Sequence, residues 1–191
     1  TTPTYANWTT NTLGLTSGVT AAIDGYYYRA VVSGTCSPAD TSAAGQLTVN
    51  IAPTITSNPS NVTLCNSGDA TFTATAGGSG SGFVHIWQVS TNGGADWTNL
   101  TNTGVYSGAQ GTVNSSSSTL TITGATTALN GYQYRDSIKA NCAPPAKSAA
   151  AVFTVNPTSV GGTLSADQAI CTGGSVTDIT LSGNTGSVVK W

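Results

Sequence analysis

An internal repeat limits what this chain can fold into. Segment 24–50 (DGYYYRAVVSGTCSPADTSAAGQLTVN) aligns without a gap with segment 130–156 (NGYQYRDSIKANCAPPAKSAAAVFTVN), so equivalent residues lie 106 positions apart. The four cysteines obey the same shift in two pairs, Cys36 with Cys142 and Cys65 with Cys171. A fixed period of this kind is the sequence signature of a repeat protein, in which each unit packs mainly against its neighbours. We therefore interpret the chain as part of a tandem array.

The repeat divides the chain into three expected parts. These are the C-terminal half of one repeat at 1–51, a complete repeat at 52–156, and the N-terminal part of a third repeat at 157–191. Trp87 and Trp191 are also equivalent, with a shift of 104 that indicates a shorter loop in the third part. We expect the chain to be an excerpt of a longer protein, whose partial repeats lack the strands that would complete their cores.

The composition favours strands over helices. The chain has no Glu, but it has 34 Thr and 22 Ser. Glu and Lys are favoured in helices, whereas Thr suits the half-buried surface of a strand. We predict an all-β protein whose helical content is limited to a turn near 125–129.

Low charge narrows the possible partners. Charged residues make up 6% of the chain and the net charge is -2, whereas ordinary soluble domains carry about 25% charged residues. A nucleic-acid-binding protein needs a basic surface, so no nucleic-acid partner is expected. No apolar run approaches the roughly 20 residues of a membrane-spanning helix, so no membrane span is expected.

Within the complete repeat, strand-like and turn-like segments alternate. In 70–76, small apolar or aromatic residues alternate with Thr, which is the period-2 pattern of a strand with one buried face. Segment 77–82 (GGSGSG) predicts a flexible connection. Segments 83–90 and 96–100 flank an Asn-Gly pair at 92–93, which supplies the positive φ of a hairpin turn. Seven or eight such strands in about 105 residues predict a sandwich of two sheets.

The stretch 119–134 (TLTITGATTALNGYQY) resembles the E-strand, the E–F connection and the F-strand of immunoglobulin-like domains. Their signature residues fall here on Leu120, Ile122, Asn130 and Tyr134. Trp87 lies where these domains have a buried Trp on strand C. The resemblance implies an immunoglobulin-like sandwich with Trp87, Leu120, Ile122 and Tyr134 as core residues. It also implies that the Tyr134 hydroxyl hydrogen-bonds to nearby backbone.

The sequence departs from this family at the disulfide that usually joins the two sheets. The F-strand Cys position is occupied by Asp136, and by Ala30 in the preceding copy. Strand B carries Ala74 and Ala76 where its Cys would be. The usual bond between the sheets is therefore not expected.

Longer motifs narrow the resemblance. The segments WQVSTNGGADWTNLTNTGVYSG, GYQYR, SGTCSP and LTVN together resemble the tandem immunoglobulin-like repeats of giant surface adhesins from gliding Bacteroidota. The resemblance implies an extracellular, cell-surface protein that is exported by the type IX system and acts in adhesion and gliding motility. The implied partners are neighbouring repeats of the same chain, surface polysaccharide, or other copies in a filament. Asp136-Ser137-Ile138 matches the pattern that Bacteroidota O-glycosylate, which makes Ser137 a candidate site.

No catalytic chemistry is predicted. His85 is the only histidine, and it is interpreted as a packed or edge residue of a strand. The chain has no GxSxG motif, no evident pair of carboxylates, and no Cys-x-x-Cys or Asp-x-Asp metal motif. We expect no enzyme activity, no catalytic residue, no cofactor and no metal site.

The aromatic residues allow two interpretations. A sugar-binding platform would use Trp97, Trp8, Tyr27 and Gln133, and it would make the chain a carbohydrate-binding accessory module of a secreted enzyme. The alternative interpretation assigns Trp97 to the cover of a sheet edge and five other aromatics to the core, namely Tyr26, Tyr28, Trp87, Tyr132 and Tyr134.

Two cysteines per repeat in an exported protein predict a disulfide. A bond between Cys65 and Cys142 would join opposite ends of a sandwich, because about ten residues of F-strand separate those ends by roughly 30 Å. Bonded cysteines need Cα atoms about 4.4–6.8 Å apart. We therefore favour bonds between the cysteines of adjacent repeats, with intradomain pairing and free thiols as the alternatives.

Overall fold

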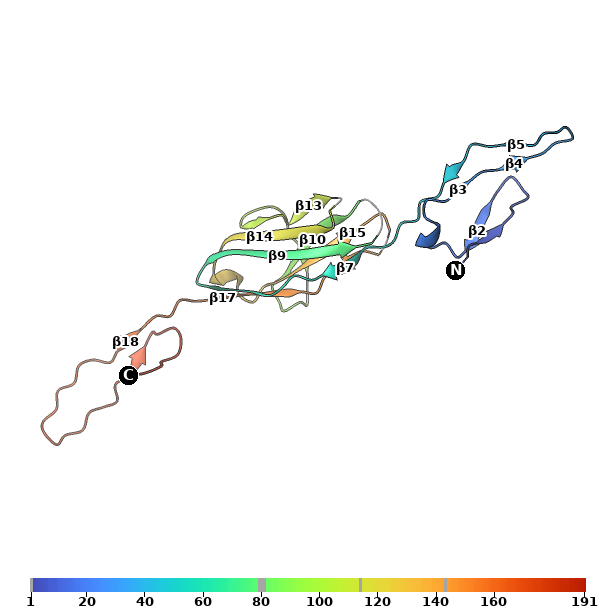
Figure 1. Ribbon diagram of the computed structural model, residues 1–191. Coiled ribbons are helices and arrows are strands. Elements are labelled where there is room, and N and C mark those ends of the chain that lie inside the picture. The colour runs from blue at the N-terminus through green and yellow to red at the C-terminus, as the bar shows by residue number, and fades with distance from the viewer. Residues whose placement is uncertain (1, 79–81, 114, 143) are drawn as a thin grey trace.

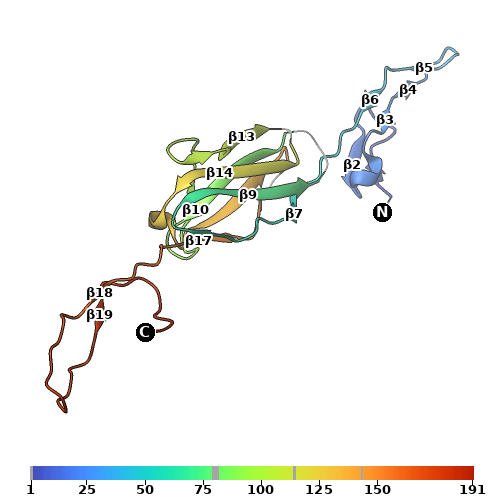
Figure 2. The ribbon, with the colours of Figure 1, turned by 60° about the vertical axis from the view of Figure 1, so that its left-hand side comes forward.

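The computed structural model describes residues 2–78, 82–113, 115–142 and 144–191 (Figure 1). Residues 52–156 (the central unit) fold into two facing sheets. Residues 2–51 (the N-terminal segment) and 157–191 (the C-terminal segment) leave this unit at opposite ends (Figures 1 and 2). Part of the connection predicted at 77–82 lies outside the described residues.

The first sheet has four strands in the order β12-β14-β9-β7. Their bounds are Tyr106–Ser107, Ser117–Ala125, Gly68–Gly77 and Thr54–Ser57. Along β9 buried and exposed residues alternate, which places Phe72 and Ala74 in the interior. Antiparallel pairing sets Leu120 of β14 opposite Phe72, so one face of this sheet forms half of the core.

The second sheet has the path β11-β10-β15-β17-β8. The bounds of these strands are Thr98–Asn99, Val84–Ser90, Gln133–Lys139, Ala151–Asn156 and Val62–Cys65. Two further strands belong to this sheet. β13 (Gln110–Val113) pairs with β10, and β16 (Ala146–Lys147) pairs with β15. β17 and β8 run parallel, and the other pairs are antiparallel.

The core lies between these two sheets. The four residues singled out by the sequence motif all have 0% exposure, namely Trp87, Leu120, Ile122 and Tyr134. The Trp87 ring donates a hydrogen bond from Nε1 to Ser118 Oγ at 3.0 Å, so its polar group is satisfied inside the core. This bond crosses from the second sheet to the first.

Tyr134 contributes both apolar surface and a polar contact. Its ring centroid lies 5.0 Å from that of Phe72. The Tyr134 hydroxyl lies 3.2 Å from the hydroxyl of Tyr106. Among the described residues the Tyr134 hydroxyl thus bonds to the side chain of Tyr106 on β12, in place of the expected bond to nearby backbone.

Helical structure is confined to two single turns among the described residues. They are η1 (Ala21–Ile23) and η2 (Thr127–Leu129), each of the 3-10 type. In η2 the Thr126 hydroxyl accepts from the amide of Ala128, which caps the turn. The prediction of an all-β fold is confirmed. Among the described residues no helix is long and apolar enough to cross a membrane.

The two flanking segments contain only short strands. In the N-terminal segment these are β1 (Thr4–Ala6), β2 (Gly14–Ser17), β3 (Tyr27–Tyr28), β4 (Val31–Val32), β5 (Asp40–Thr41) and β6 (Gly45–Gln46). In the C-terminal segment they are β18 (Thr163–Leu164) and β19 (Leu181–Ser182). All of them pair as two-stranded ribbons.

The expected core placement of two N-terminal tyrosines is wrong for this structure. Tyr26 is 49% exposed, and Tyr28 is only partly buried. The physical reason is that the sheets of the described N-terminal segment have only two strands each, so they offer little surface to cover these side chains. The ring of Tyr5 on β1 lies 6.1 Å from that of Tyr28. Tyr132 and Tyr134, the equivalents of Tyr26 and Tyr28, do pack against the core of the central unit.

Candidate functional site at the ends and interior of the central unit

A buried pair of titratable groups lies on the interior face of the second sheet. His85 on β10 and Asp136 on β15 both have 0% exposure. The His85 Nδ1 atom lies 2.5 Å from Asp136 Oδ2, and His85 Nε2 lies 2.9 Å from the carbonyl oxygen of Ser115. A carbonyl and a carboxylate both accept hydrogen bonds. This geometry therefore suits a ring that is protonated on both nitrogens.

The surroundings set the pKa of His85. Burial of the ring lowers this pKa, whereas the bonds to Asp136 and to the Ser115 carbonyl raise it. The net effect is a pKa above the ordinary histidine value of 6.5. The second carboxylate oxygen, Asp136 Oδ1, has no hydrogen-bond partner among the described residues. Desolvation of such an oxygen is costly, which makes the bond to His85 more important for stability.

The His85–Asp136 pair lies in the buried interior of the central unit. The sequence predicted a packed histidine at His85 but did not identify Asp136 as its partner. One available signal was that Asp136 replaces an interior Cys and therefore needs a polar partner on the same face. Because both side chains are sealed from solvent, no substrate reaches them in the folded chain. Among the described residues no group of three or more His, Cys or Asp is placed to hold a metal ion.

The four residues of the predicted sugar platform are not brought together. Trp97 and Gln133 both flank Gly94 in the central unit, whereas Trp8 and Tyr27 belong to the N-terminal segment. The Trp97 Nε1 group donates to the Gly94 carbonyl at 3.0 Å. One face of its ring is covered by Arg135, whose Cζ lies 4.0 Å from the ring centroid.

The glycosylation candidate Ser137 lies inside the second sheet. It is 7% exposed, and it pairs with Ile86 on one side and with Lys147 on the other. An enzyme that attaches a sugar needs access to the hydroxyl, and the folded sheet does not offer it.

The cysteines Cys65 and Cys142 lie at opposite ends of the central unit. In the antiparallel β15–β17 pair, Gln133 lies opposite Val152. Cys142 follows nine residues after Gln133, and Asn156, the partner of Cys65, follows four residues after Val152 in the opposite direction. Thirteen residues at about 3.3 Å each amount to roughly 40 Å.

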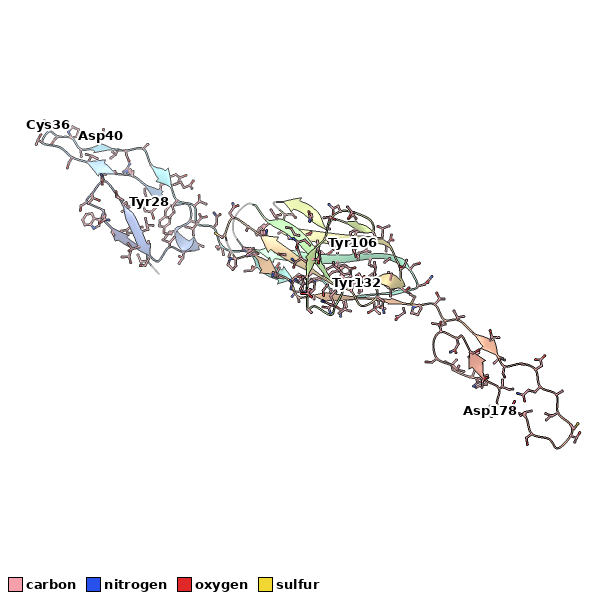
Figure 3. All side chains as sticks on the ribbon, turned by 180° about the vertical axis from the view of Figure 1, so that it is seen from behind. Tyr28, Cys36, Asp40, Tyr106, Tyr132 and Asp178 are labelled. Carbon is pink, nitrogen blue, oxygen red and sulfur yellow. The ribbon has the colours of Figure 1, made fainter. Side chains whose placement is uncertain are left out.

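That separation has a direct consequence for pairing. Bonded cysteines have Cα atoms about 4.4–6.8 Å apart, so this geometry does not allow a bond within one unit. All four cysteines are free thiols in the structure. Cys36 lies at the far tip of the N-terminal segment (Figure 3).

The chain has only distant similarity to known proteins. No model of a known protein family matches the chain, and no curated protein is similar to it. Among solved structures, the complex of titin M10 with an obscurin-like 1 immunoglobulin domain is 20% identical, with a TM-score of 0.44 over 56% of this chain and 97% of that chain. The tandem Ig repeats of Dlar are 17% identical, with a TM-score of 0.46 over 62% of this chain and 55% of that chain.

A third structure, an I-band fragment of titin, is 14% identical, with a TM-score of 0.48 over 62% of this chain and 37% of that chain. The fold of the central unit follows from its sheet order. The path β12-β14-β9-β7 corresponds to strands D, E, B and A, and the facing sheet contains C, F and G. The chain is a β-protein whose central unit has the immunoglobulin-like sandwich fold.

Proposed function

We propose that this chain is a segment of a long tandem array of immunoglobulin-like repeats, which acts as a stiff spacer in a cell-surface adhesin. The observation that carries the proposal is the recurrence of one hydrogen-bond pattern at the repeat distance. The Gly25 amide donates to the Leu47 carbonyl at 2.9 Å, and the Gly131 amide donates to the Phe153 carbonyl at 2.8 Å.

Side-chain bonds recur in the same way. The Asp24 carboxylate accepts from the amide of Val49 at 2.7 Å, and the Asn130 amide oxygen accepts from the amide of Val155 at 2.9 Å. The tyrosine pair also has a counterpart, because the hydroxyls of Tyr5 and Tyr28 lie 3.2 Å apart, as do those of Tyr106 and Tyr134. These matches support the interpretation of 1–51 as part of a repeat equivalent to 52–156.

The arrangement of the units suits a spacer. The chain enters and leaves the central unit at opposite ends (Figure 1), so each added unit lengthens the molecule. Tandem copies extend such an array through contacts between neighbours and need no new site. A surface with 6% charged residues and many hydroxyl groups does not require electrostatic steering.

The finer assignment rests on the sequence motifs that resemble the adhesins of gliding Bacteroidota. On that basis the array is placed outside the cell, exported by the type IX system, and used in surface adhesion and gliding. Its partners are then neighbouring repeats of the same chain, with surface polysaccharide or other copies of the chain at the adhesive contact.

An antibody tests this proposal. Antibodies raised against residues 52–156 are expected to label intact cells of the source organism and to slow their attachment to glass and their movement over it. Labelling that appears only after the cells are broken would contradict the surface location. Surface labelling without any effect on attachment would contradict the adhesive role.

A carbohydrate-binding accessory module is the alternative. Its support is the exposure of two aromatic side chains, with Trp8 at 76% and Tyr27 at 67%. Exposed aromatic rings are suited to stacking on sugars. Affinity electrophoresis in gels that contain bacterial polysaccharides tests it. Retardation of the chain that is lost in Trp8→Ala and kept in Trp97→Ala would favour this module, because Trp97 is already covered by Arg135.

A further inference from the structure

We infer that consecutive repeats are joined by a disulfide between the cysteine at the Cys65 position of one repeat and the cysteine at the Cys142 position of the next. This inference goes beyond the spacer role, and it rests on the tandem array and the location outside the cell proposed above, because disulfides persist in oxidising compartments. It is carried by the surroundings of Asn50 and its equivalent Asn156, which lie at the two ends of the central unit.

Cys142 contacts the residues that precede the central unit. Its Sγ donates to the carbonyl oxygen of Asn50 at 3.2 Å. An opening of about 170 Å³ lies beside this thiol and is also lined by Lys139, Ala140 and Pro145. The thiol is therefore placed against the preceding segment with space next to it for another side chain.

Cys65 has the complementary position at the other end. It is the parallel-strand partner of Asn156, and the amide of the next residue, Asn66, donates to the Asn156 carbonyl at 2.6 Å. Asn156 is equivalent to Asn50 by the shift of 106 residues. Cys142 thus contacts the carbonyl oxygen of Asn50, and Asn66, the residue after Cys65, contacts the equivalent carbonyl oxygen of Asn156.

The two observations place both cysteines at one junction. The backbone before Asn50 keeps the repeat geometry, because the amides of Val49 and Val155 are held by equivalent side chains, those of Asp24 and Asn130. Neighbouring strands lie about 4.7–4.9 Å apart. A cysteine at the Cys65 position of a preceding repeat would therefore lie one strand spacing from Asn50, whose carbonyl oxygen the Cys142 thiol contacts. Both cysteines would then adjoin the same residue, as the short Cα separation of about 4.4–6.8 Å in a disulfide requires.

The bond forms by thiol–disulfide exchange with a donor disulfide, such as oxidised glutathione or the oxidised form of an oxidoreductase. One cysteine thiolate attacks a donor sulfur and releases the first donor thiol, which leaves a mixed disulfide. The second cysteine thiolate then displaces the second donor thiol. The two cysteines lose two protons and two electrons, and the donor disulfide is reduced to two thiols.

A chain with one complete junction tests the inference. It consists of residues 1–156 followed by residues 51–191, so that the central unit occurs twice with the native spacing after Asn156, the equivalent of Asn50, and it carries Cys36→Ser and Cys171→Ser. Four cysteines remain, two in each copy. The chain is oxidised with oxidised glutathione at low concentration, and the monomer is isolated. It is then denatured, alkylated and weighed by mass spectrometry.

We expect one intramolecular disulfide and two cysteines without a protein partner. Cys65→Ser in the first copy is expected to abolish the disulfide, whereas Cys65→Ser in the second copy is the matched control and leaves it intact. Two disulfides in the chain would show pairing within each copy and would overturn the inference. No disulfide would also overturn it, provided that near-ultraviolet circular dichroism shows both copies folded, and this result would leave the spacer proposal standing.

Discussion

The central unit and the N-terminal segment share a sequence pattern and a set of hydrogen bonds, but they differ in burial. Ile138 has 0% exposure, whereas its equivalent Val32 is 65% exposed. The same difference separates Tyr134 from Tyr28. Local backbone bonds follow from local sequence, because both partners lie within about 25 residues. Burial requires facing sheets of several strands, and among the described residues only the central unit has sheets of more than two strands.

The largest effect is expected from the Trp at the centre of the core. Trp87→Ala should lower the free energy of unfolding by about 3–5 kcal/mol, because it removes a fully buried ring and leaves a cavity. Urea unfolding followed by circular dichroism measures this loss. Trp8→Ala is the control, and as an exposed substitution it should stay within about 0.5 kcal/mol. Equal effects of the two substitutions would contradict the difference between the regions.

A matched pair of equivalent positions sharpens the comparison. Ile138→Ala should cost about 2–5 kcal/mol in the same assay, because Ile138 packs in the core. Val32→Ala should cost no more than about 0.5 kcal/mol, because Val32 lies in a two-stranded ribbon exposed to solvent. A loss at Val32 as large as that at Ile138 would mean that the N-terminal segment has a core of its own.

The buried pair predicts a dependence on pH that the N-terminal segment lacks, since Ala30 stands there in place of Asp136. The pKa of His85 is higher in the folded chain than in the unfolded one. Protonation therefore stabilises the fold fully below about pH 6.5, and this contribution is lost as the pH rises through the folded-state pKa.

The predicted loss of stability with rising pH is tested in a variant in which all four cysteines are replaced by Ser, so that no thiol titrates. The free energy of unfolding should fall as the pH rises from 6 toward 9. The double variant His85→Leu with Asp136→Ala should show a flatter profile over the same range. Stability that rises with pH in the parent chain would refute the protonated state of His85.

The smallest effect is expected on the outer surface. Arg135→Ala removes a guanidinium that lies over the Trp97 ring and donates to Gln88 at 2.8 Å. It should cost about 0.5–1 kcal/mol and should change the fluorescence of Trp97. The equivalent substitution Arg29→Ala is the control and should change neither quantity. Equal effects of Arg135→Ala and Arg29→Ala on stability and on Trp97 fluorescence would contradict the predicted difference between the two regions.

Much of the fold was predictable because it depends on patterns that are local in sequence. The alternation in 70–76 predicted β9 and its buried face, and the motif around Leu120 and Ile122 predicted core residues that the structure buries completely. The His85–Asp136 bond was not predicted. Asp136 lies directly opposite Trp87, two residues along β10 from His85. A one-residue change of register would therefore separate the two side chains.

Exposure at two other positions was not predictable from the local sequence, for a common physical reason. Tyr26 has the same local pattern as Tyr132, but burial depends on strands far away in sequence, and these do not face the described N-terminal segment. Ser137 was a glycosylation candidate on the Asp136-Ser137-Ile138 motif alone, and such a motif carries no information on exposure. The strands on both sides of Ser137, β10 and β16, reduce its exposure to 7%.

Hydrogen–deuterium exchange tests most directly the claim that equivalent bonds are supported by a core in one region and not in the other. The amides of Phe153 and Leu47 each donate at 2.8 Å to equivalent carbonyls, those of Tyr132 and Tyr26. We predict that the Phe153 amide exchanges only on global unfolding of the central unit, whereas the Leu47 amide exchanges by local opening and orders of magnitude faster. Equal protection of the two amides would contradict this account.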